Sequence, residues 1–265
     1  MINDIKRAFE GRKARPNEIL FYEATDSTNE RARHYPLEHS FDFKIEQSGF
    51  SAELFIADAQ SAGRGRVGRK FVSNRGAGLY MSLRFDFPLD MRDSVGITPL
   101  AAVAVCRALK RVCGAEASIK WVNDIYMDGR KLAGILTEST LDKSGKRKYI
   151  CGIGINLLPS DMPPELTGIV TNLSELGCTP DRFELAAAIT EELLMNLENP
   201  FSPDIASEYK SRSFLIGKRV SVIDGERTSS ATVTDISDRY ELNVQFDDGA
   251  VKSLATGEVS IRCNL

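Results

Sequence analysis

The chain of 265 residues contains few of the side chains that most catalytic and metal sites use. Its two histidines, His34 and His39, lie in one polar stretch, so a reaction that needs histidine as a general base has few candidates. No C-x-x-C pair occurs, which disfavours a zinc finger. The odd number of widely spaced cysteines predicts reduced core thiols in a cytosolic protein, at Cys106, Cys113, Cys151, Cys178 and Cys263.

Long hydrophobic runs and a strong excess of one charge are also absent. The longest apolar run, around residues 100–106, falls far short of the roughly 20 residues that cross a bilayer, and residues 1–7 lack the apolar core of a signal peptide. The 34 Lys and Arg residues nearly balance 37 Asp and Glu residues, which disfavours a chain-wide basic surface for nucleic acid. We therefore expect a cytoplasmic protein, with no membrane association, whose electrostatic site is local.

What is present is the composition of an ordinary globular protein, 42% hydrophobic and 27% charged, and the helices and strands predicted along the chain favour an α+β fold. Alternating and continuous apolar runs predict strands at 18–23, 54–57, 79–85, 119–121, 125–127, 131–138 and 148–157, the last four as an antiparallel meander. Ser27 and Glu30 match a capping box that would begin a helix towards Arg33. Further helices are predicted at 93–113, 181–197 and 203–214. We expect a mixed β-sheet with flanking helices.

The composition changes near Gly217 to short β-rich runs separated by turn residues. The predicted strands are 220–223, 231–236, 241–246, 250–254 and 259–262, which is typical of a small five-stranded barrel. We therefore expect two domains, residues 1–216 and residues 217–265.

The segment Gly63-Arg64-Gly65-Arg66-Val67-Gly68-Arg69-Lys70 carries four cations and three glycines in eight residues. Glycine lets backbone N–H groups approach a ligand, and arginine binds carboxylate and phosphate oxygens, so the segment indicates an anion-binding loop. It also matches G-x-G-x-x-G. A strand follows it instead of an apolar helix, which disfavours a nicotinamide or flavin oxidoreductase, and no Walker A sequence occurs.

Polar residues gather a second time in Lys120-Trp121-Val122-Asn123-Asp124 and just after it. A hairpin with Asn123 and Asp124 as turn formers explains this segment as well as a ligand site does. Lys131 stands between a turn and an apolar run, so its ammonium group is expected to reach a cleft. Two interpretations also stay open for four other polar residues: they hydrogen-bond backbone groups, or they contact a ligand. These residues are Ser27 and Thr28 at the start of a helix, and Gln60 and Asn156 at the ends of strands.

Five motifs stand in order along the chain: 26–29 (DSTN), 60–71 (QSAGRGRVGRKF), 120–124 (KWVND), 130–136 (RKLAGIL) and 152–156 (GIGIN). Together they resemble the biotin protein ligase family. The resemblance implies the class II synthetase-like biotin–lipoate ligase fold with an SH3-like C-terminal domain. It also implies a two-step reaction, in which the biotin carboxylate attacks the α-phosphorus of MgATP and a lysine of a biotin carboxyl carrier protein then accepts the biotinyl group from biotinyl-5′-AMP.

Family motif positions imply the site residues. Biotin would be bound by Ser27, Thr28, Asn29, Gln60, Gly63, Arg64, Gly65, Arg66, Lys131 and Gly134. ATP would be bound by Arg66, Arg69, Lys120, Asn123, Asp124 and Asn156, with Mg²⁺ arriving with ATP and no metal ligand assigned. Arg64, Arg66 and Lys131 would act as catalytic cations, because a carboxylate must approach an anionic phosphate. The Gly/Arg loop is expected to be mobile when empty and to order over the adenylate.

Phe71 and Val122 depart from the family pattern, where many relatives carry Trp and Pro, so the resemblance does not carry a stacking role over to these positions. About twenty residues precede the first predicted strand, too few for the winged helix of repressor relatives, so we expect no DNA binding. An exposed sheet edge would allow a homodimer. Two alternatives remain: a lipoate or octanoate protein ligase, whose R-R-x-x-G-G-G signature is missing, and a non-catalytic biotin-binding regulator.

Overall fold

The computed structural model describes residues 2–35, 51–86, 93–142, 145–197, 199–255 and 260–263, the last of these through the backbone. Among these residues, no helix combines the length and the apolar character needed to cross a membrane. His39 and Val259, which belong to predicted features, lie outside the described residues.

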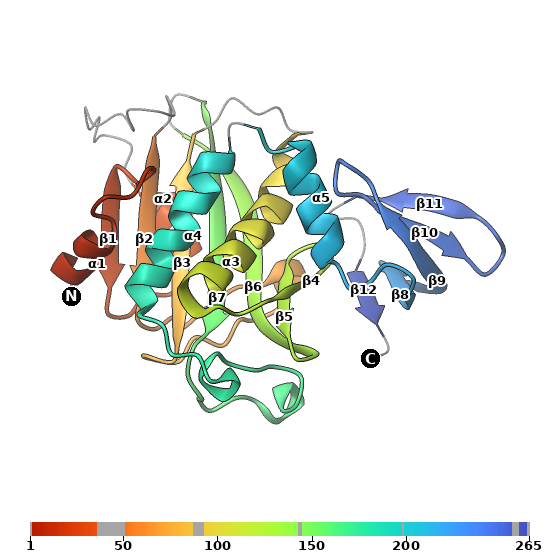
Figure 1. Cartoon of the computed structure of the whole chain (residues 1–265), viewed down its shortest axis with the longest axis horizontal. Helices are drawn as coiled ribbons and strands as arrows, with labels where there is room; N and C mark the ends of the chain where they lie inside the picture. The colour runs from red at the N-terminus through yellow and green to blue at the C-terminus, as the bar shows by residue number, and fades with distance from the viewer. Residues whose placement is uncertain are drawn as a thin grey trace.

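A seven-stranded mixed sheet forms the larger part of the molecule (Figure 1). Its strands are β1 (Glu18–Tyr22), β2 (Ala52–Ala57), β3 (Gly78–Phe85), β4 (Ser118–Lys120), β5 (Asp124–Met127), β6 (Arg130–Leu141) and β7 (Arg147–Asn156). The spatial order is β1-β2-β3-β7-β6-β5-β4, with β1 and β2 parallel and all other neighbours antiparallel. The predicted meander of the last four strands is confirmed.

Helices cover both faces of this sheet. They are α1 (Ile2–Ala8), α2 (Thr28–His34), α3 (Ile97–Cys113), α4 (Arg182–Asn196) and α5 (Pro203–Arg212). Short 3₁₀ turns occupy Arg66–Gly68, Asp93–Gly96, Pro164–Leu166 and Ser174–Leu176. Figure 1 shows α3 and α4 together on one face, with α2 on the other. Because successive side chains of a strand point to opposite faces, Leu54 and Ile56 join the large core under α3 and α4, whereas Phe55 packs with Ala32 of α2.

A separate five-stranded antiparallel sheet follows α5, as the sequence predicted. Its strands are β8 (Arg219–Asp224), β9 (Arg227–Ile236), β10 (Leu242–Phe246), β11 (Val251–Leu254) and β12 (Ser260–Cys263). They are ordered β11-β10-β9-β8-β12. This small sheet, together with the larger mixed sheet and its flanking helices, agrees with the predicted fold class.

The small sheet is tied to the larger one by the turn that joins β9 and β10. Tyr240 in this turn is buried, and its carbonyl oxygen accepts a 2.8 Å hydrogen bond from Trp121 Nε1. Its ring lies edge-on to that of Tyr209 in α5, with ring centroids 5.2 Å apart, and the Tyr209 hydroxyl donates to the carbonyl of Val122. The two sheets therefore share a buried aromatic contact next to residues 120–124.

One expectation about cysteine is corrected, and one helix was not predicted. Cys113, at the end of α3, and Cys178 form a disulfide with 6.0 Å between their Cα atoms, so these two are not reduced thiols. Cys106 and Cys151 are free and buried, as predicted, and burial raises the pKa of each thiol to about 12. Helix α1 was not predicted, because only Ile5 and Ala8 of its seven residues are buried. The partners of a disulfide 65 residues apart cannot be inferred from spacing.

Candidate functional site

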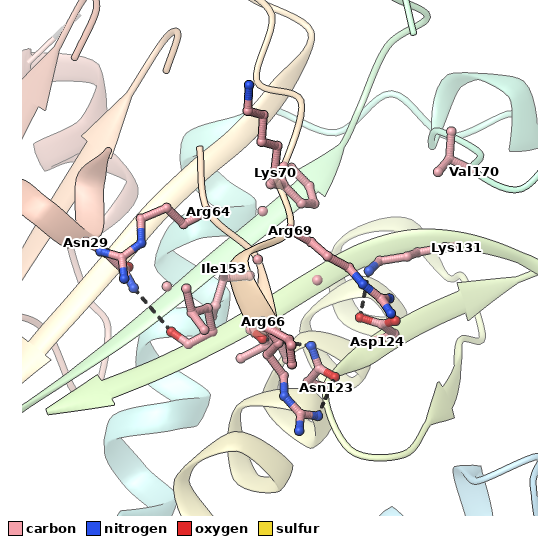
Figure 2. A pocket seen from close by; sticks show the side chains of 18 of the residues that line it. Asn29, Arg64, Arg66, Arg69, Lys70, Asn123, Asp124, Lys131, Ile153 and Val170 are labelled. Carbon is pink, nitrogen blue, oxygen red and sulfur yellow. Dashed lines mark hydrogen bonds and ion pairs between the residues drawn. The ribbon is translucent and has the colours of Figure 1, made fainter. Parts of the chain in front are cut away.

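A cavity of about 470 Å³ opens on the α2 face of the seven-stranded sheet (Figure 2). Its floor is made where β3, β7 and β6 run side by side, with Gly134 opposite Gly154 and Leu136 opposite Gly152. A Cβ atom on Gly154 would lie 2.5 Å from Phe71 Cε1, and one on Gly152 would collide with Asn29 Oδ1. The glycines therefore leave room for side chains that come from outside the sheet and line the cavity.

The Gly/Arg segment forms a small hairpin across the cavity. The N–H of Phe71 donates to the carbonyl of Gly63, and the N–H of Gly65 donates to the carbonyl of Arg69 at 2.7 Å. At the tip Val67 has a φ of 53°, a left-handed conformation that is uncommon for a β-branched residue. The predicted loop thus folds as a hairpin turn with its own backbone hydrogen bonds.

Arg66 extends from the hairpin into the cavity, as Figure 2 shows. Its Nη1 donates to Asn123 Oδ1 at 3.1 Å, and Asn123 Nδ2 donates to the carbonyl of Ile135. Burial lowers the pKa of Arg66, while the charge of Asp124 opposes that effect. In the described part of the chain, neither Arg66 nor Arg69 forms an ion pair with a carboxylate, and both line the cavity. Arginine stays protonated in proteins, so both bring positive charge to an incoming anion.

Lys131 and Asp124 form an ion pair on the wall of the cavity, with 2.7 Å between Nζ and Oδ1. The backbone of Lys131 also pairs with a neighbouring segment, because its N–H donates to the carbonyl of Ile169 and its carbonyl accepts from Thr171. Lys120 lies on the same side, with Nζ 5.8 Å from the centroid of the Tyr126 ring. The positive charges at this end of the cavity therefore come from Arg66 and Arg69 of the hairpin, from Lys131 and from Lys120.

At the other end of the cavity the lining side chains of Ser27, Thr28 and Gln60 are polar and uncharged, and the Arg64 guanidinium beside them is paired with carboxylates. The backbone N–H and the hydroxyl of Thr28 both lie within hydrogen-bond distance of Gln60 Oε1, at 2.8 and 3.1 Å. Gln60 Nε2 donates to Ser73 Oγ. Ser27 is the N-cap of α2, yet its hydroxyl makes no hydrogen bond with another described residue. It therefore faces the cavity with donor and acceptor capacity to spare.

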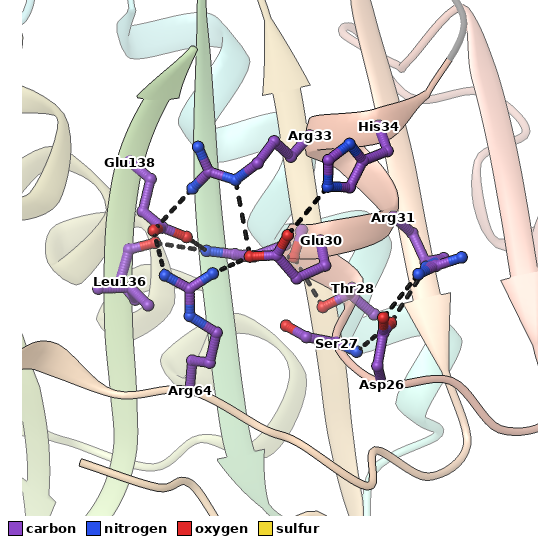
Figure 3. Close-up of polar contacts among 12 residues, drawn as sticks. Asp26, Ser27, Thr28, Glu30, Arg31, Arg33, His34, Arg64, Leu136 and Glu138 are labelled. Atoms are coloured by element: carbon purple, nitrogen blue, oxygen red, sulfur yellow. Dashed lines mark hydrogen bonds and ion pairs between the residues drawn. The ribbon is translucent and has the colours of Figure 1, made fainter. Parts of the chain in front are cut away.

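The expected capping box at this helix is wrong. Ser27 does not cap α2 with its side chain, and Asp26 Oδ1 accepts from the backbone N–H of Ser27 instead. Glu30, the other half of the box, turns away from the helix end and pairs with Arg64 and Arg33 (Figure 3). Glu30 thus gives up the hydrogen bond at the start of the helix that a capping box predicts. This indicates that its ion pairs with Arg64 and Arg33 determine where its side chain lies.

The structure brings together thirteen of the fifteen predicted site residues. Ser27, Thr28, Asn29, Gln60, Arg64, Gly65, Arg66, Arg69, Lys120, Asn123, Asp124, Lys131 and Gly134 all line the cavity. Gly63 and Asn156 do not. Gly63 lies in the hairpin against the carbonyl of Phe71, and Asn156 is buried, with Nδ2 donating to the carbonyl of Thr171 at 3.0 Å. Asn156 thus holds the segment after β7 in place, one of the two uses that the sequence left open.

Sequence reasoning did not assign the apolar part of the wall. Phe71 packs against Gly154, and the segment between β7 and α4 contributes Leu166, Ile169 and Val170. The glycines at 152 and 154 were recognised as part of a motif but given no role. Only the cross-strand register, which places them opposite Leu136 and Gly134, shows that they form the floor.

Carboxylates are scarce at this site. Among the described residues that line the cavity, Asp124 is the one carboxylate, and no group of three metal-binding side chains is found in the described ranges. Mg²⁺ commonly needs only one or two protein carboxylates when substrate phosphates complete its coordination. The side chains present therefore fit a cation that comes with a nucleotide and do not form a preformed metal site.

Comparison with known proteins agrees with this geometry. Residues 24–156 match the model of the biotin/lipoate A/B protein ligase family. The bifunctional ligase/repressor BirA of Bacillus subtilis is 40% identical over 143 residues, which cover 53% of this chain and 43% of that protein. A biotin–acetyl-CoA-carboxylase ligase of Mycobacterium tuberculosis is 32% identical over 79% of each chain. The chain thus spans less than half the length of the Bacillus relative.

A solved structure resembles the whole described fold. The biotin protein ligase of Aquifex aeolicus, in complex with biotin and ATP, superposes with a TM-score of 0.75 and 26% identity, covering 94% of this chain and 100% of that one. The family match covers both ends of the cavity and the hairpin between them. The chain belongs to the biotin/lipoate A/B protein ligase family.

Proposed function

We propose that this protein activates biotin with ATP and transfers the biotinyl group to a lysine of a biotin carboxyl carrier protein. One observation supports this most directly: a single cavity joins an uncharged polar end to a cationic end, and a hairpin spans the two. A ligand with a neutral hydrogen-bonding head and a carboxylate tail matches the two ends, and the ATP phosphates match the cations beyond the tail.

In the first step, a carboxylate oxygen of biotin attacks the α-phosphorus of ATP, and the bond from that phosphorus to the β-phosphate oxygen breaks as pyrophosphate leaves. Two anions about 4 Å apart repel by about 4 kcal/mol at an effective dielectric constant near 20. Arg66 and Arg69, which pair with no described carboxylate, would offset this repulsion, because their charges are fixed before the ligands arrive. Lys131, which is paired with Asp124, would add its charge once Asp124 binds the Mg²⁺ that comes with ATP. Asp124 is the carboxylate available to a Mg²⁺ ion that arrives with ATP, which would neutralise phosphate charge.

In the second step, the unprotonated amine of the acceptor lysine attacks the acyl carbon of biotinyl-5′-AMP. AMP leaves and the new amide loses a proton. The polar end would hold the biotin head through the free hydroxyl of Ser27 and through the Thr28 and Gln60 pair. The requirement for ATP and a carboxylase partner supports a cytoplasmic location.

The test is transfer of labelled biotin from MgATP to an apo carrier domain. Wild type is expected to label one lysine, and Arg66→Met is expected to lower kcat/KM by about two to three orders of magnitude, since one fixed charge contributes about 4 kcal/mol. Lys6→Met, at an exposed position of α1, is the matched control and should behave as wild type.

Other outcomes would overturn the proposal. Transfer of lipoate or octanoate in place of biotin would leave the fold but replace the substrate. Binding of biotin without adenylate formation would indicate a regulator that uses the same scaffold.

A further inference from the structure

We propose that Glu30 and Glu138 are positioning residues that hold the hairpin 63–71 over the cavity by binding the guanidinium group of Arg64. This inference rests on the proposed function and assigns Arg64 a different task from the one its motif suggested. Arg64 would act as an anchor of the hairpin, and its charge would not act on the substrate. Figure 3 shows the side chains of Arg64, Glu30 and Glu138 meeting one another.

The ion pairs of Arg64 use both ends of its guanidinium group. Nη1 donates to Glu30 Oε1 on α2, and Nη2 donates to Glu138 Oε1 on β6 at 2.7 Å. Arg33 approaches the same two carboxylates, with Nη2 2.8 Å from Glu138 Oε1. The positive charge of Arg64 is therefore matched by carboxylates before any ligand binds.

The two ends of the hairpin differ in how they are held. Arg64 is bound by two carboxylates on one side of the cavity, whereas Arg66 on the other side is bound by the neutral amide of Asn123. Figure 2 shows the two arginines extending in different directions from the hairpin. An incoming anion competes only with a neutral group for Arg66, but with two charges for Arg64. The ligand should thus capture Arg66 and leave Arg64 in place.

Glu138 also connects the anchor to the polar end of the cavity. Its Oε2 accepts from Asn29 Nδ2 at 2.8 Å, and Asn29 Oδ1 lies 2.6 Å from the buried hydroxyl of Ser82. That hydroxyl lies 2.7 Å from Thr28 Oγ1, and Thr28 pairs with Gln60. A continuous hydrogen-bonded chain therefore joins the hairpin anchor to the residues proposed to hold the biotin head. Asn29 is a link in this chain.

The first experiment needs no substrate. The hairpin contains four trypsin sites, at Arg64, Arg66, Arg69 and Lys70. In Glu30→Gln/Glu138→Gln, which keeps side-chain size and removes both charges, cleavage within 63–71 should be several-fold faster than in wild type. The matched control is Glu208→Gln, because Glu208 also binds two arginines, Arg107 and Arg212, but does not line the cavity. Equal cleavage in all three proteins would overturn the inference.

The second experiment separates anchoring from general support of the fold. With MgATP present, Glu138→Gln should raise the KM for biotin about five- to tenfold over wild type, as expected when an ion pair is reduced to a neutral hydrogen bond, and leave kcat within about twofold. Arg64→Met should do the same, and the double variant should be no worse than either single variant.

Additive effects in that double-mutant cycle would show that Glu138 acts through Arg33 or Asn29, which refutes the anchor. A loss of kcat in Arg64→Met with unchanged KM would show that the Arg64 charge acts in the reaction, which refutes it as well. If wild type itself forms no adenylate, the proposed function fails, while the proteolysis result still decides whether the anchor exists.

Discussion

The hydrogen bond between the two sheets predicts a measurable effect on both stability and nucleotide use. Trp121→Phe keeps an aromatic ring in a site that is 4% exposed but removes the N–H that donates to the Tyr240 carbonyl. Leaving a buried carbonyl without a donor costs about 1–3 kcal/mol. The smaller ring adds a modest loss of packing, so the free energy of unfolding should fall by about 2–3 kcal/mol.

Nucleotide use should change because of where Trp121 lies. Asn123, two residues further on, binds Arg66 at the cationic end of the cavity. The KM for ATP should therefore rise by more than the KM for biotin. Urea unfolding and initial rates of adenylate formation measure the two effects.

Tyr240→Phe is the comparison variant, because it deletes the hydroxyl that donates to the Pro200 carbonyl at 2.6 Å but keeps the carbonyl that accepts from Trp121. It should lose stability and leave the KM for ATP unchanged. A change of less than about 0.5 kcal/mol in Trp121→Phe, with the same urea dependence, would refute the reasoning, since surface-like substitutions produce changes of that size. Equal effects of both variants on the KM for ATP would refute the link between the sheets and the nucleotide.

Three further results are expected. Gly154→Ala should displace Phe71, because Phe71 Cε1 would lie 2.5 Å from the new Cβ. The Kd for biotin, measured by titration, should therefore rise about tenfold or more. Reduction of the Cys113–Cys178 disulfide should lower the free energy of unfolding by about 4 kcal/mol, as loop closure over 65 residues predicts, and Cys113→Ser should abolish the effect of reductant. Burial alone would raise the pKa of Asp86, but hydrogen bonds and two lysines lower it to about 2, so its contribution of about 2 kcal/mol is complete above about pH 5 and is lost as the pH falls through about 2. Asp86→Asn should therefore flatten the acid limb of the unfolding curve.

Much of the fold could be predicted because its strands carry their signal locally. The alternation in Gly78–Phe85 and the turn residues between the strands from 118 to 156 decided strand positions and antiparallel neighbours without tertiary information. The five strands of the small sheet followed from the same signals. The domain boundary at Gly217 stays a prediction, although α5 ends at Arg212 and β8 begins at Arg219.

The sequence could not predict features that depend on distant partners. Ser27 and Glu30 have the local pattern of a capping box, but the ion pair with Arg64, 34 positions further along, turns Glu30 away from the helix end. In the sequence, Glu138 is only the polar residue at the end of a predicted strand. It becomes part of the anchor because β6 brings it beside α2, where it binds Arg64. The segment 166–170 contributes to the cavity because it pairs with Lys131, and no motif marks it.

The roles of the arginines illustrate why a motif does not by itself assign the chemistry. Arg64 and Arg66 are two residues apart and both match the family pattern, yet one is matched by two carboxylates and the other by a neutral amide. A cation that is already paired must lose that pairing before it can stabilise a substrate charge, whereas a cation held by an amide keeps its full charge for the ligand. The two arginines therefore have different roles. Arg64, which is paired with two carboxylates, can hold the hairpin, and Arg66, which is bound only by an amide, can stabilise the reacting anions.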